Sequence, residues 1–503
     1  MTAIKNLLDR LTGRVPMYRL VVILLVIIAA YSLVLSALGQ LTYEPLELLA
    51  SLLISVAITV ASSWAVARLF RARFHLDSAL ITGLLLFYVL IPTSEPSELL
   101  VLALAAVIAS ASKFVLAWRG RHIFNPAAIA ALIVTATGLT FSGWWVATAN
   151  LLPVVAVASF LVLYRTRRLT MGIVFVVVAA AIQIVRFTTA GTDFGQSAQI
   201  AFVSTAIVFL AGFMLSEPLT LPPRHWQQLG LAVLVAALFA IPFNIGPVYS
   251  SPQLALVVGN LVAFFFGQRR GIALDFVGKK QLTPSTWEFT FQPARPVRFT
   301  PGQYMELTVP HSGADFRGTR RIFSISSAPV ADGPVTFAMT ITDKPSSFKR
   351  ALLALEPGAR LRGTSVGGDF ALPADATTPV LLVAGGIGIT PFSSQLAAAT
   401  PAARDVVVVY AVSRTSDLAY ADVLEQSGVR VVLVSPEAPE GMPATWSWAG
   451  PGRISRELIA SSVPDASSRR AFVSGPPALV NDVRGMLKSL GAKRVTSDYF
   501  SGY

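Results

Sequence analysis

Near residue 385 the chain reads Leu381-Leu382-Val383-Ala384-Gly385-Gly386-Ile387-Gly388-Ile389-Thr390-Pro391-Phe392. The apolar first part predicts a buried strand, and Thr390-Pro391 is typical of the start of a helix. Glycines between a strand and a helix let backbone N–H groups face a phosphate. A glycine turn is a weak signal by itself, so its meaning depends on the segments around it.

The segments on either side of this turn follow two different patterns. From about residue 377 onward, apolar runs alternate with helical stretches, which predicts a doubly wound α/β domain over residues 376–503. Its strands are expected at Val380–Ala384, Val406–Ala411, Val429–Val434 and Ala471–Ser474. Before it, short alternating strands separated by Gly and Pro turns predict a small antiparallel β-barrel domain over residues 271–375. These strands are expected at Trp287–Phe291, Tyr304–Val309, Arg321–Ile325, Val335–Ile341 and Arg360–Val366.

Three further motifs in this half carry side chains suited to a cofactor. Arg320-Arg321-Ile322-Phe323-Ser324-Ile325-Ser326-Ser327 sets a cation, an aromatic ring and a hydroxyl side by side on one strand. A bound flavin needs such groups, with the Arg on its pyrophosphate and the ring against the isoalloxazine. Gly367-Gly368-Asp369-Phe370 is a tight turn in which backbone can approach a flat ring closely. Ser474-Gly475-Pro476-Pro477 follows the last predicted strand.

In this order, the motifs resemble the ferredoxin–NADP reductase superfamily over residues 274–503. The resemblance implies FAD and NAD(P)H as cofactors and an NAD(P)H-dependent flavin oxidoreductase. It assigns Arg321 to the FAD phosphates, Phe323 to the isoalloxazine and Ser324 to the region of its N5 atom. The remaining residues assigned to FAD are Tyr304, Ser346, Ser347, Gly367, Gly368 and Phe370. Those assigned to the pyridine dinucleotide are Gly385, Gly386, Gly388, Thr390, Pro391, Ser413, Arg414, Gly475 and Pro476.

The chain departs from the family pattern at two places and shares a terminal feature with many of its members. Phe323 replaces the usual Tyr, so stacking is kept and a hydroxyl is lost. Ser474 replaces a common Cys. The chain ends with aromatic residues, of which Phe500 or Tyr503 would cover the flavin where the nicotinamide enters. Ser324, Ser474, Phe500 and Tyr503 are therefore the candidate catalytic residues. The Ser413-Arg414 pair occurs with either nucleotide, which leaves NADH and NADPH both open.

Composition separates this half from the residues before about 268. Of the 503 residues, 54% are hydrophobic and 13% are charged, whereas soluble domains average roughly 25% charged residues. About ten apolar runs in the first half are long enough to cross a bilayer as helices. We place them near residues 20–38, 48–67, 76–91, 97–117, 125–141, 147–164, 170–187, 197–215, 229–245 and 252–267. Residues 1–270 are therefore expected to form a polytopic membrane domain, joined to the barrel by a short segment from Gly267 to Phe276.

Charge in the loops predicts the orientation of these spans. One set of alternate loops carries basic residues such as Arg68, Arg71 and Arg165, and the other carries acids such as Glu95 or no charge. By the positive-inside rule the basic loops are cytoplasmic, and an even span count places both termini in the cytoplasm. We expect a multi-pass protein of the cell inner (plasma) membrane, with the lipid bilayer as a partner. The net charge of +13 follows from this topology, so no nucleic-acid partner is expected.

Residue types limit the redox chemistry of the membrane half. The chain has no cysteine, which excludes an iron–sulfur cluster held by thiolates. Its four histidines are His75, His122, His225 and His311, none of them inside a predicted span. A transmembrane haem path needs pairs of intramembrane histidines, so no haem and no metal site are expected. Asn260 is one of few polar residues deep in a span, and such groups often mark functional sites.

Two motifs at span ends carry a second resemblance. His122-Ile123-Phe124-Asn125-Pro126-Ala127-Ala128 opens the fifth span, and Phe213-Met214-Leu215-Ser216-Glu217-Pro218-Leu219-Thr220 closes the eighth. With about ten spans, they resemble the NqrB/RnfD family, membrane subunits of sodium-pumping NADH–quinone reductase and of the Rnf complex. The resemblance implies a flavin, FMN or riboflavin, in the membrane domain. The family's acceptor motif for covalent FMN is not found in the outer loop at residues 188–199, so Thr192 or Ser197 would line a non-covalent site.

These features together predict a membrane oxidoreductase. Electrons would pass from cytosolic NAD(P)H through FAD into a flavin-containing membrane domain, and on to a quinone or an extracytoplasmic acceptor protein. One alternative is a redox-driven Na⁺ or H⁺ pump, although no carboxylate lies deep in a predicted span. The other is a transporter whose flavin domain only senses redox state.

Overall fold

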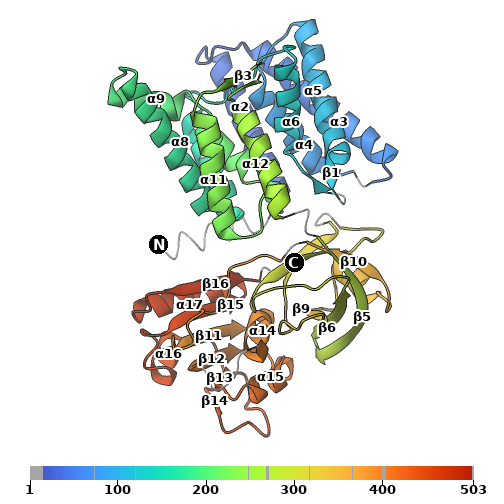
Figure 1. Cartoon of the computed structure of the whole chain (residues 1–503), viewed down its shortest axis with the longest axis vertical. Coiled ribbons are helices and arrows are strands. Elements are labelled where there is room, and N and C mark those ends of the chain that lie inside the picture. Colours follow the sequence, from blue (N-terminus) through green and yellow to red (C-terminus); the bar gives the residue numbers. More distant parts are fainter. Residues whose placement is uncertain are drawn as a thin grey trace. The chain divides into compact units, whose positions relative to one another are not determined.

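The structure is a computed structural model that describes residues 15–500 except 73, 119–120, 247, 268–270, 316–317, 365 and 399–403. The chain forms two compact units, one ending at residue 269 and the other beginning at residue 270 (Figure 1). We call residues up to 269 the membrane unit and residues from 270 the soluble unit. The predicted boundary between barrel and α/β domain at 375 remains a prediction.

Helices make up most of the membrane unit, and each predicted apolar run coincides with one of them. The first five are α2 (Met17–Ala37), α3 (Pro45–Leu69), α4 (Leu76–Val89), α5 (Pro96–Val115) and α6 (Pro126–Ala136). The others are α7 (Leu152–Arg165), α8 (Leu169–Thr189), α9 (Phe194–Val203), α10 (Ile207–Phe209), η1 (Leu210–Leu215), η2 (Pro218–Thr220), α11 (His225–Ala240) and α12 (Pro252–Phe266). Two hairpins complete the unit, β1 (Ala117–Trp118) with β2 (Arg121–His122) and β3 (Asn244–Ile245) with β4 (Val248–Tyr249).

By length and composition, four helices in the described part of the chain are long and apolar enough to cross a membrane. They are α2, α3, α5 and α8. A fifth candidate is the pair α9 and α10–η1, which is bent by 46° at the break between Val203 and Ile207. The other five apolar helices are shorter, and a count of ten spans remains a prediction.

The chain between α6 and α7 differs from the predicted spans at 125–141 and 147–164. The helix α6 ends at Ala136, and Gly138 follows with a positive φ of 72°, a conformation that stops a helix. The helix α7 begins only at Leu152, with Pro153 in its first turn. Between them Trp144, Trp145 and Val146 are buried without helical structure. Irregular backbone of this kind is tolerated at membrane depth where protein surrounds it.

The first part of the soluble unit is a six-stranded antiparallel sheet, with strand order β8-β7-β10-β5-β6-β9. Its strands are β5 (Ile272–Thr283), β6 (Thr286–Pro293), β7 (Tyr304–Thr308), β8 (Arg320–Ser324), β9 (Val335–Thr340) and β10 (Arg360–Gly363). A bridge between Ile325 and Phe337 joins the ends of the two edge strands, β8 and β9. A short helix, α13 (Ser347–Leu353), packs on the apolar interior through Phe348.

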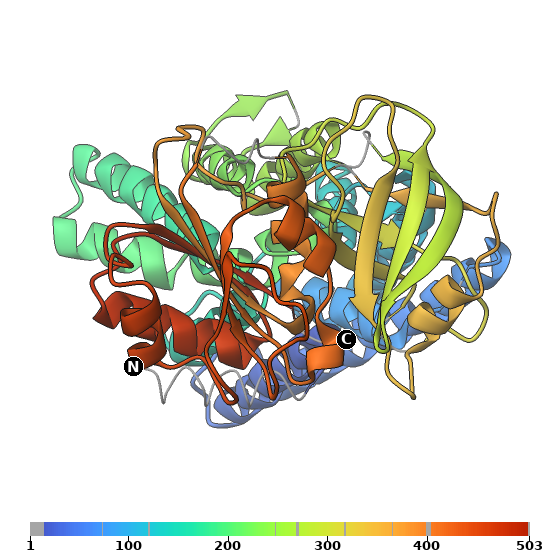
Figure 2. The same ribbon diagram turned by 90° about the horizontal axis from the view of Figure 1, so that it is seen from below.

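The second part is a six-stranded sheet in which every pairing is parallel, with order β14-β13-β12-β11-β15-β16. Figure 2 shows this sheet, in orange and red, as a layer distinct from the yellow-green antiparallel strands. Its strands are β11 (Val380–Gly385), β12 (Val406–Ala411), β13 (Arg430–Val434), β14 (Trp446–Trp448), β15 (Arg470–Gly475) and β16 (Val495–Tyr499). The helices and turns are η4 (Gly386–Ile389), α14 (Thr390–Ala398), η5 (Thr415–Asp417), α15 (Ala421–Gln426), α16 (Arg456–Ser462) and α17 (Pro477–Ser489).

Strand prediction missed the polar strands of both sheets. The segment from Gly267 to Phe276 was predicted as a connection, but β5 begins at Ile272 and Phe276 is buried in the barrel core. The strands β14 and β16 also lacked the apolar runs by which the central strands were found. The strand order reverses on either side of β11, and ligands of such sheets bind at the carboxyl ends of the strands beside this point.

Candidate functional site

The glycine turn after β11 allows two strand ends to approach each other closely. Gly386 has a positive φ of 52°, a backbone conformation that favours glycine. Gly388 lies against the end of β15. A Cβ atom on Gly388 would lie 2.4 Å from the Ser474 carbonyl oxygen. Helix α14 begins directly after this turn, and the Thr390 hydroxyl donates a hydrogen bond to the Ile387 carbonyl at 2.7 Å. The predicted residues Gly385, Gly386, Gly388 and Thr390 therefore lie beside Ser474 and Gly475.

The end of β15 brings together three residues from the predicted nicotinamide side. Ser474 is fully buried, and its hydroxyl oxygen has no hydrogen-bond partner within the described part of the chain. Gly475, with a φ of 150°, packs against the Gly385 backbone. The Phe500 N–H donates to the Gly475 carbonyl at 2.9 Å, which fixes the last described residue beside this turn. The other predicted cover, Tyr503, lies outside the described residues.

On the barrel side, Tyr304 and Ser324 are cross-strand partners in the β7–β8 register. Gly368 approaches the Tyr304 ring so closely that a Cβ atom there would lie 2.8 Å from a ring carbon. Tyr304 also pairs with Gly367 through two backbone hydrogen bonds. The turn at Gly367-Gly368 is thereby held against the Tyr304 ring and against β7, the strand that pairs with the one carrying Ser324.

Asp498 links the two sides of this site, and it was not among the predicted site residues. It lies opposite Ser474 in the β15–β16 register, and the Ser324 hydroxyl donates to its carboxylate at 3.5 Å. Burial of the carboxyl group raises the pKa of Asp498 to about 6. A carboxyl group with this pKa can hold and release a proton near neutral pH. The residue went unnoticed because strand β16 was not predicted.

Arg321 is the residue predicted to bind the FAD phosphates. Its guanidinium lies over the Phe348 ring, 5.2 Å from the ring centre, and 3.6 Å from the Asp315 carboxylate. Only 11% of the Arg321 side chain is exposed. Ser346 and Ser347 lie in the same region, since Ser346 caps helix α13 and the Ser347 hydroxyl accepts from the Asp315 N–H at 2.8 Å. The structure therefore brings Arg321 and both serines together.

The two aromatic residues predicted at the flavin both pack against other rings. The Phe370 ring is buried between Phe392 and Phe472, with ring centres 5.6 and 5.5 Å away. Its ring packs in the core of the parallel sheet, and its contact with a cofactor remains a prediction. Phe323 packs beside Phe348 at 5.8 Å and keeps part of its surface exposed. Because the strand alternates, Phe323 faces the barrel interior with Met305, whereas Tyr304 shares the other face with Ser324.

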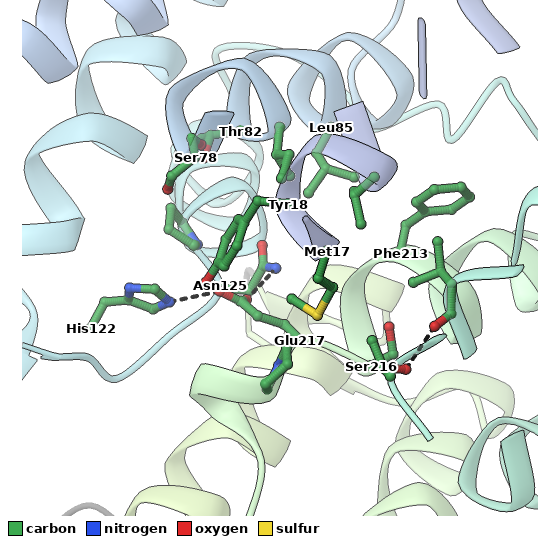
Figure 3. A pocket seen from close by; sticks show the side chains of 16 residues that line it. Met17, Tyr18, Ser78, Thr82, Leu85, His122, Asn125, Phe213, Ser216 and Glu217 are labelled. Atoms are coloured by element: carbon green, nitrogen blue, oxygen red, sulfur yellow. Dashed lines mark hydrogen bonds and ion pairs between the residues drawn. The ribbon is translucent and has the colours of Figure 1, made fainter. Parts of the chain in front are cut away.

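In the membrane unit, a small pocket of about 50 Å³ forms where five segments meet (Figure 3). They are the starts of α2, α4 and α6 and the ends of α7 and η1. The exposed surface of the pocket is mainly apolar, although eight of its sixteen lining residues are polar. The polar residues are Tyr18, Ser78, Thr82, His122, Asn125, Thr166, Ser216 and Glu217. An apolar surface with a few convergent polar groups is typical of small-molecule sites.

The two membrane motifs meet at this pocket through Glu217. One carboxylate oxygen of Glu217 lies 2.8 Å from His122 Nε2, and the other accepts from the Asn125 amide at 2.8 Å. Asn125 also caps α6, and its backbone N–H donates to the Asn260 side chain at 2.8 Å. Figure 3 shows His122 and Asn125 converging on Glu217. Both motifs are visible in the sequence, but the residues that join them lie more than 90 positions apart.

The predicted outer flavin site has less support. Ser197 is buried and hydrogen-bonded, because its hydroxyl accepts from Thr188 at 3.3 Å and donates to the Thr192 carbonyl at 3.4 Å. The pocket at Glu217 is lined by neither Thr192 nor Ser197. The Ser197 hydroxyl is therefore bonded within its own loop, and a flavin at this loop remains a prediction.

The soluble unit fits FAD and a pyridine dinucleotide by its own geometry. Gly388 lets the turn after β11 approach the end of β15 closely, Gly368 does the same beside the Tyr304 ring, and Arg321 supplies a cation for a phosphate. The Ser474 hydroxyl beside Gly388 is buried and has no hydrogen-bond partner within the described residues. Ser324 and Asp498 add a hydroxyl and a carboxyl group at the same place.

Comparison with known proteins supports this assignment. A family model described as "Oxidoreductase NAD-binding domain" matches residues 382–485. Ferredoxin–NADP reductase B of Sorangium cellulosum is 31% identical over 209 residues, which cover 40% of this chain and 81% of that protein. The NADH oxidoreductase HCR of Escherichia coli is 30% identical over 224 residues, which cover 44% of this chain and 65% of that protein.

Among solved structures, the chain is similar to a ferredoxin NADP⁺ reductase from Neisseria gonorrhoeae with bound FAD and NADP. That match has 20% identity and a TM-score of 0.39, and it covers 46% of this chain and 98% of the other. The assignment to a family rests on the sequence relatives. The glycine turn, Arg321 and Ser324 agree with it. The C-terminal half of the chain belongs to the ferredoxin–NADP reductase family and is an NAD(P)H-dependent oxidoreductase that uses FAD.

Proposed function

We propose that the whole chain is a membrane oxidoreductase that moves electrons from cytosolic NAD(P)H into its membrane unit. From there they would pass to a quinone or to an acceptor on the outer face. FAD, when bound, accepts a hydride and returns electrons singly, which suits a two-electron donor and one-electron acceptors. The observation that carries the proposal is the pocket at Glu217, where both motifs of the membrane unit meet.

In the soluble unit, the proposed roles follow from position. Gly386, Gly388 and the start of α14 would bind the dinucleotide pyrophosphate with backbone N–H groups. Arg321 would hold the FAD phosphates. Ser324 and Asp498 would hold a proton beside the flavin, since the pKa of Asp498 is raised by burial to about 6. Phe500 and the aromatic end of the chain would exclude water there.

The positions of the pocket's walls support a cytoplasmic entry point. The starts of α2, α4 and α6 and the ends of α7 and η1 all adjoin loops that the charge pattern assigns to the cytoplasm. All of these helix ends meet at one pocket, which agrees with the predicted orientation of the spans. We therefore assign this pocket, and not the loop at Thr192, to the flavin or quinone that receives electrons. The His122–Glu217 pair would orient it and exchange protons with it.

The direct test uses the purified full-length chain in lipid vesicles, with NADH or NADPH added from outside. Quinone reduction that requires the soluble unit, together with a second flavin released by acid precipitation, would support the proposal. One FAD per chain with no quinone reduction would contradict it. The membrane location is tested separately, by protease access to the soluble unit in intact cells and in inverted vesicles.

A second candidate function is an ion pump driven by the same electron flow. The break between α9 and α10, with the π-helical turn η1 after it, favours this function because broken helices often form ion and substrate sites. Such a pump would show quinone reduction that depends on sodium or that acidifies the vesicle lumen. Rates indifferent to sodium and to an uncoupler would exclude it.

A further inference from the structure

The segment after β12 contains two opposite charges that bear on the choice of nucleotide. The strand ends at Ala411 and is followed by Ser413-Arg414-Thr415-Ser416-Asp417. In dinucleotide-binding sheets, side chains near the end of the second strand contact the adenosine ribose. An acid suits the 2′-hydroxyl of NADH, and an Arg suits the 2′-phosphate of NADPH. The arrangement of Arg414 and Asp417 should therefore decide between the two.

Asp417 already occupies Arg414 and is itself held in place. The Arg414 Nε donates to the Asp417 carboxylate at 2.7 Å. On its other oxygen, Asp417 accepts from the Ser285 hydroxyl at 2.7 Å and from Thr283 at 3.4 Å, both from the antiparallel sheet. Burial alone would raise the pKa of Asp417, but the hydrogen bonds from Arg414 and Ser285 outweigh it, so the pKa is lowered. Asp417 is therefore ionised at neutral pH.

Further acids surround the same segment. The hydrogen bond to Asp417 raises the pKa of Arg414 most, and the negative charge of Asp343 adds to the effect. The Thr415 hydroxyl is bonded to the backbone of Glu437 through both its N–H and its carbonyl, so the loop after β13 lies alongside. The side chains of Glu437 and Glu440 in that loop are exposed. A dianionic 2′-phosphate would meet one neutralised Arg and several carboxylates.

We infer that the site takes NADH in preference to NADPH, with Asp417 as the specificity-determining residue. Asp417 holds the Arg414 fork away from a 2′-phosphate and repels that phosphate. The uncharged 2′-hydroxyl of NADH meets neither obstacle. This inference rests on the proposed function, because it names the donor for the same flavin. Repulsion of the wrong ligand is a common basis of specificity.

The test measures anaerobic reduction of the bound FAD in the purified full-length protein by stopped-flow absorbance. NADH should reduce it with a kcat/KM at least about 100-fold higher than NADPH. In competition, 5′-ADP should inhibit the NADH reaction at lower concentrations than 2′,5′-ADP. Equal or faster reduction by NADPH, or tighter inhibition by 2′,5′-ADP, would overturn the inference.

The variant Asp417→Asn keeps the shape of the residue and removes its charge. It should lower the NADH/NADPH ratio at least about tenfold, mainly through faster reaction with NADPH. The matched control is Asp422→Asn, which removes an exposed acid five residues further along and should leave the ratio unchanged. An unchanged ratio in Asp417→Asn, or an equal change in both variants, would overturn the role of Asp417.

The outcomes separate this inference from the proposed function. If NADPH reduces the flavin and NADH does not, the oxidoreductase assignment stands and the NADH inference fails. If neither nucleotide reduces bound FAD, the proposed function itself fails. The wild-type measurement requires no variant, so it decides the question even if Asp417→Asn does not fold.

Discussion

In the soluble unit, the residues of the site follow one another in short runs, and each run lies at the end of one strand. Gly386 to Gly388 follow β11, and Ser474 and Gly475 end β15. In the membrane unit, Glu217 meets His122 and Asn125 across 95 and 92 positions of sequence. A strand and its turn impose local spacing, so a motif reveals the site. A helical bundle assembles its site from the ends of distant helices, and each end carries only one or two of the residues.

This difference predicts that damage to either unit should leave the chemistry of the other intact. A variant in the soluble unit should stop electrons from entering, whereas a variant in the membrane pocket should stop them from leaving. The four experiments below test this separation, from the largest expected effect to the smallest.

The variant Gly388→Ala should have the largest effect. Its Cβ atom would lie 2.4 Å from the Ser474 carbonyl oxygen and force the ends of β11 and β15 apart. We expect FAD reduction by NADH to slow by about 100-fold, because small displacements at a reacting site are costly, while FAD content is kept. Gly485→Ala is the control, since Gly485 is exposed in α17 with no atom within 4 Å of a new Cβ. Normal reduction in Gly388→Ala would refute the assignment of this turn.

The variant Arg321→Ala should reduce FAD affinity by about 30-fold, because it removes a charged hydrogen-bond donor to phosphate. FAD per chain after dialysis is the readout. Arg362→Ala, an exposed arginine on the same sheet, should keep its FAD. The same FAD content in both variants would show that Arg321 does not bind FAD and has only a structural role, through its contacts with Phe348 and Asp315.

The variant Glu217→Gln tests the membrane unit alone. Loss of the carboxylate changes the hydrogen bonds to His122 and Asn125 and should slow electron transfer to quinone by about tenfold. The rate of FAD reduction by NADH should not change, which is the reverse of the result for Gly388→Ala. Glu98→Gln, an exposed acid in the first turn of α5, is the control. A parallel fall in both rates would contradict the separation of the two units.

The variant Asp498→Asn should have the smallest effect, a change in stability that depends on pH. The folded-state pKa of Asp498, about 6, lies above the value of about 3.9 for an unfolded Asp, so stability falls as the pH rises from about 4 to about 6, and the full cost remains at higher pH. The variant Asp498→Asn removes this cost and should raise the melting temperature by about 2 to 5 °C at pH 8, and not at pH 4. A shift of the same size at both values of pH would mean that Asp498 does not titrate in this range.

Particular residues show how much of this molecule could be predicted. The central strands β11 and β12 are buried on both faces, so their apolar runs revealed both the α/β sheet and its glycine turn. Strand β16 has no such run, and Asp498 was missed with it. The Phe370 ring was assigned to the cofactor because it follows two glycines, but tertiary packing with Phe392 and Phe472 determines its place. In the membrane unit the pattern predicted helices and orientation, but not the pocket that joins them.

The central claim is that electrons from NAD(P)H reach a second carrier in the membrane unit. The most direct measurement is an anaerobic titration of the purified full-length protein with NADH, followed by flavin absorbance. If the membrane unit holds a flavin, the protein should consume about two equivalents of NADH per chain, one for each flavin. An end point at one equivalent, with only FAD released on acid precipitation, would contradict the account.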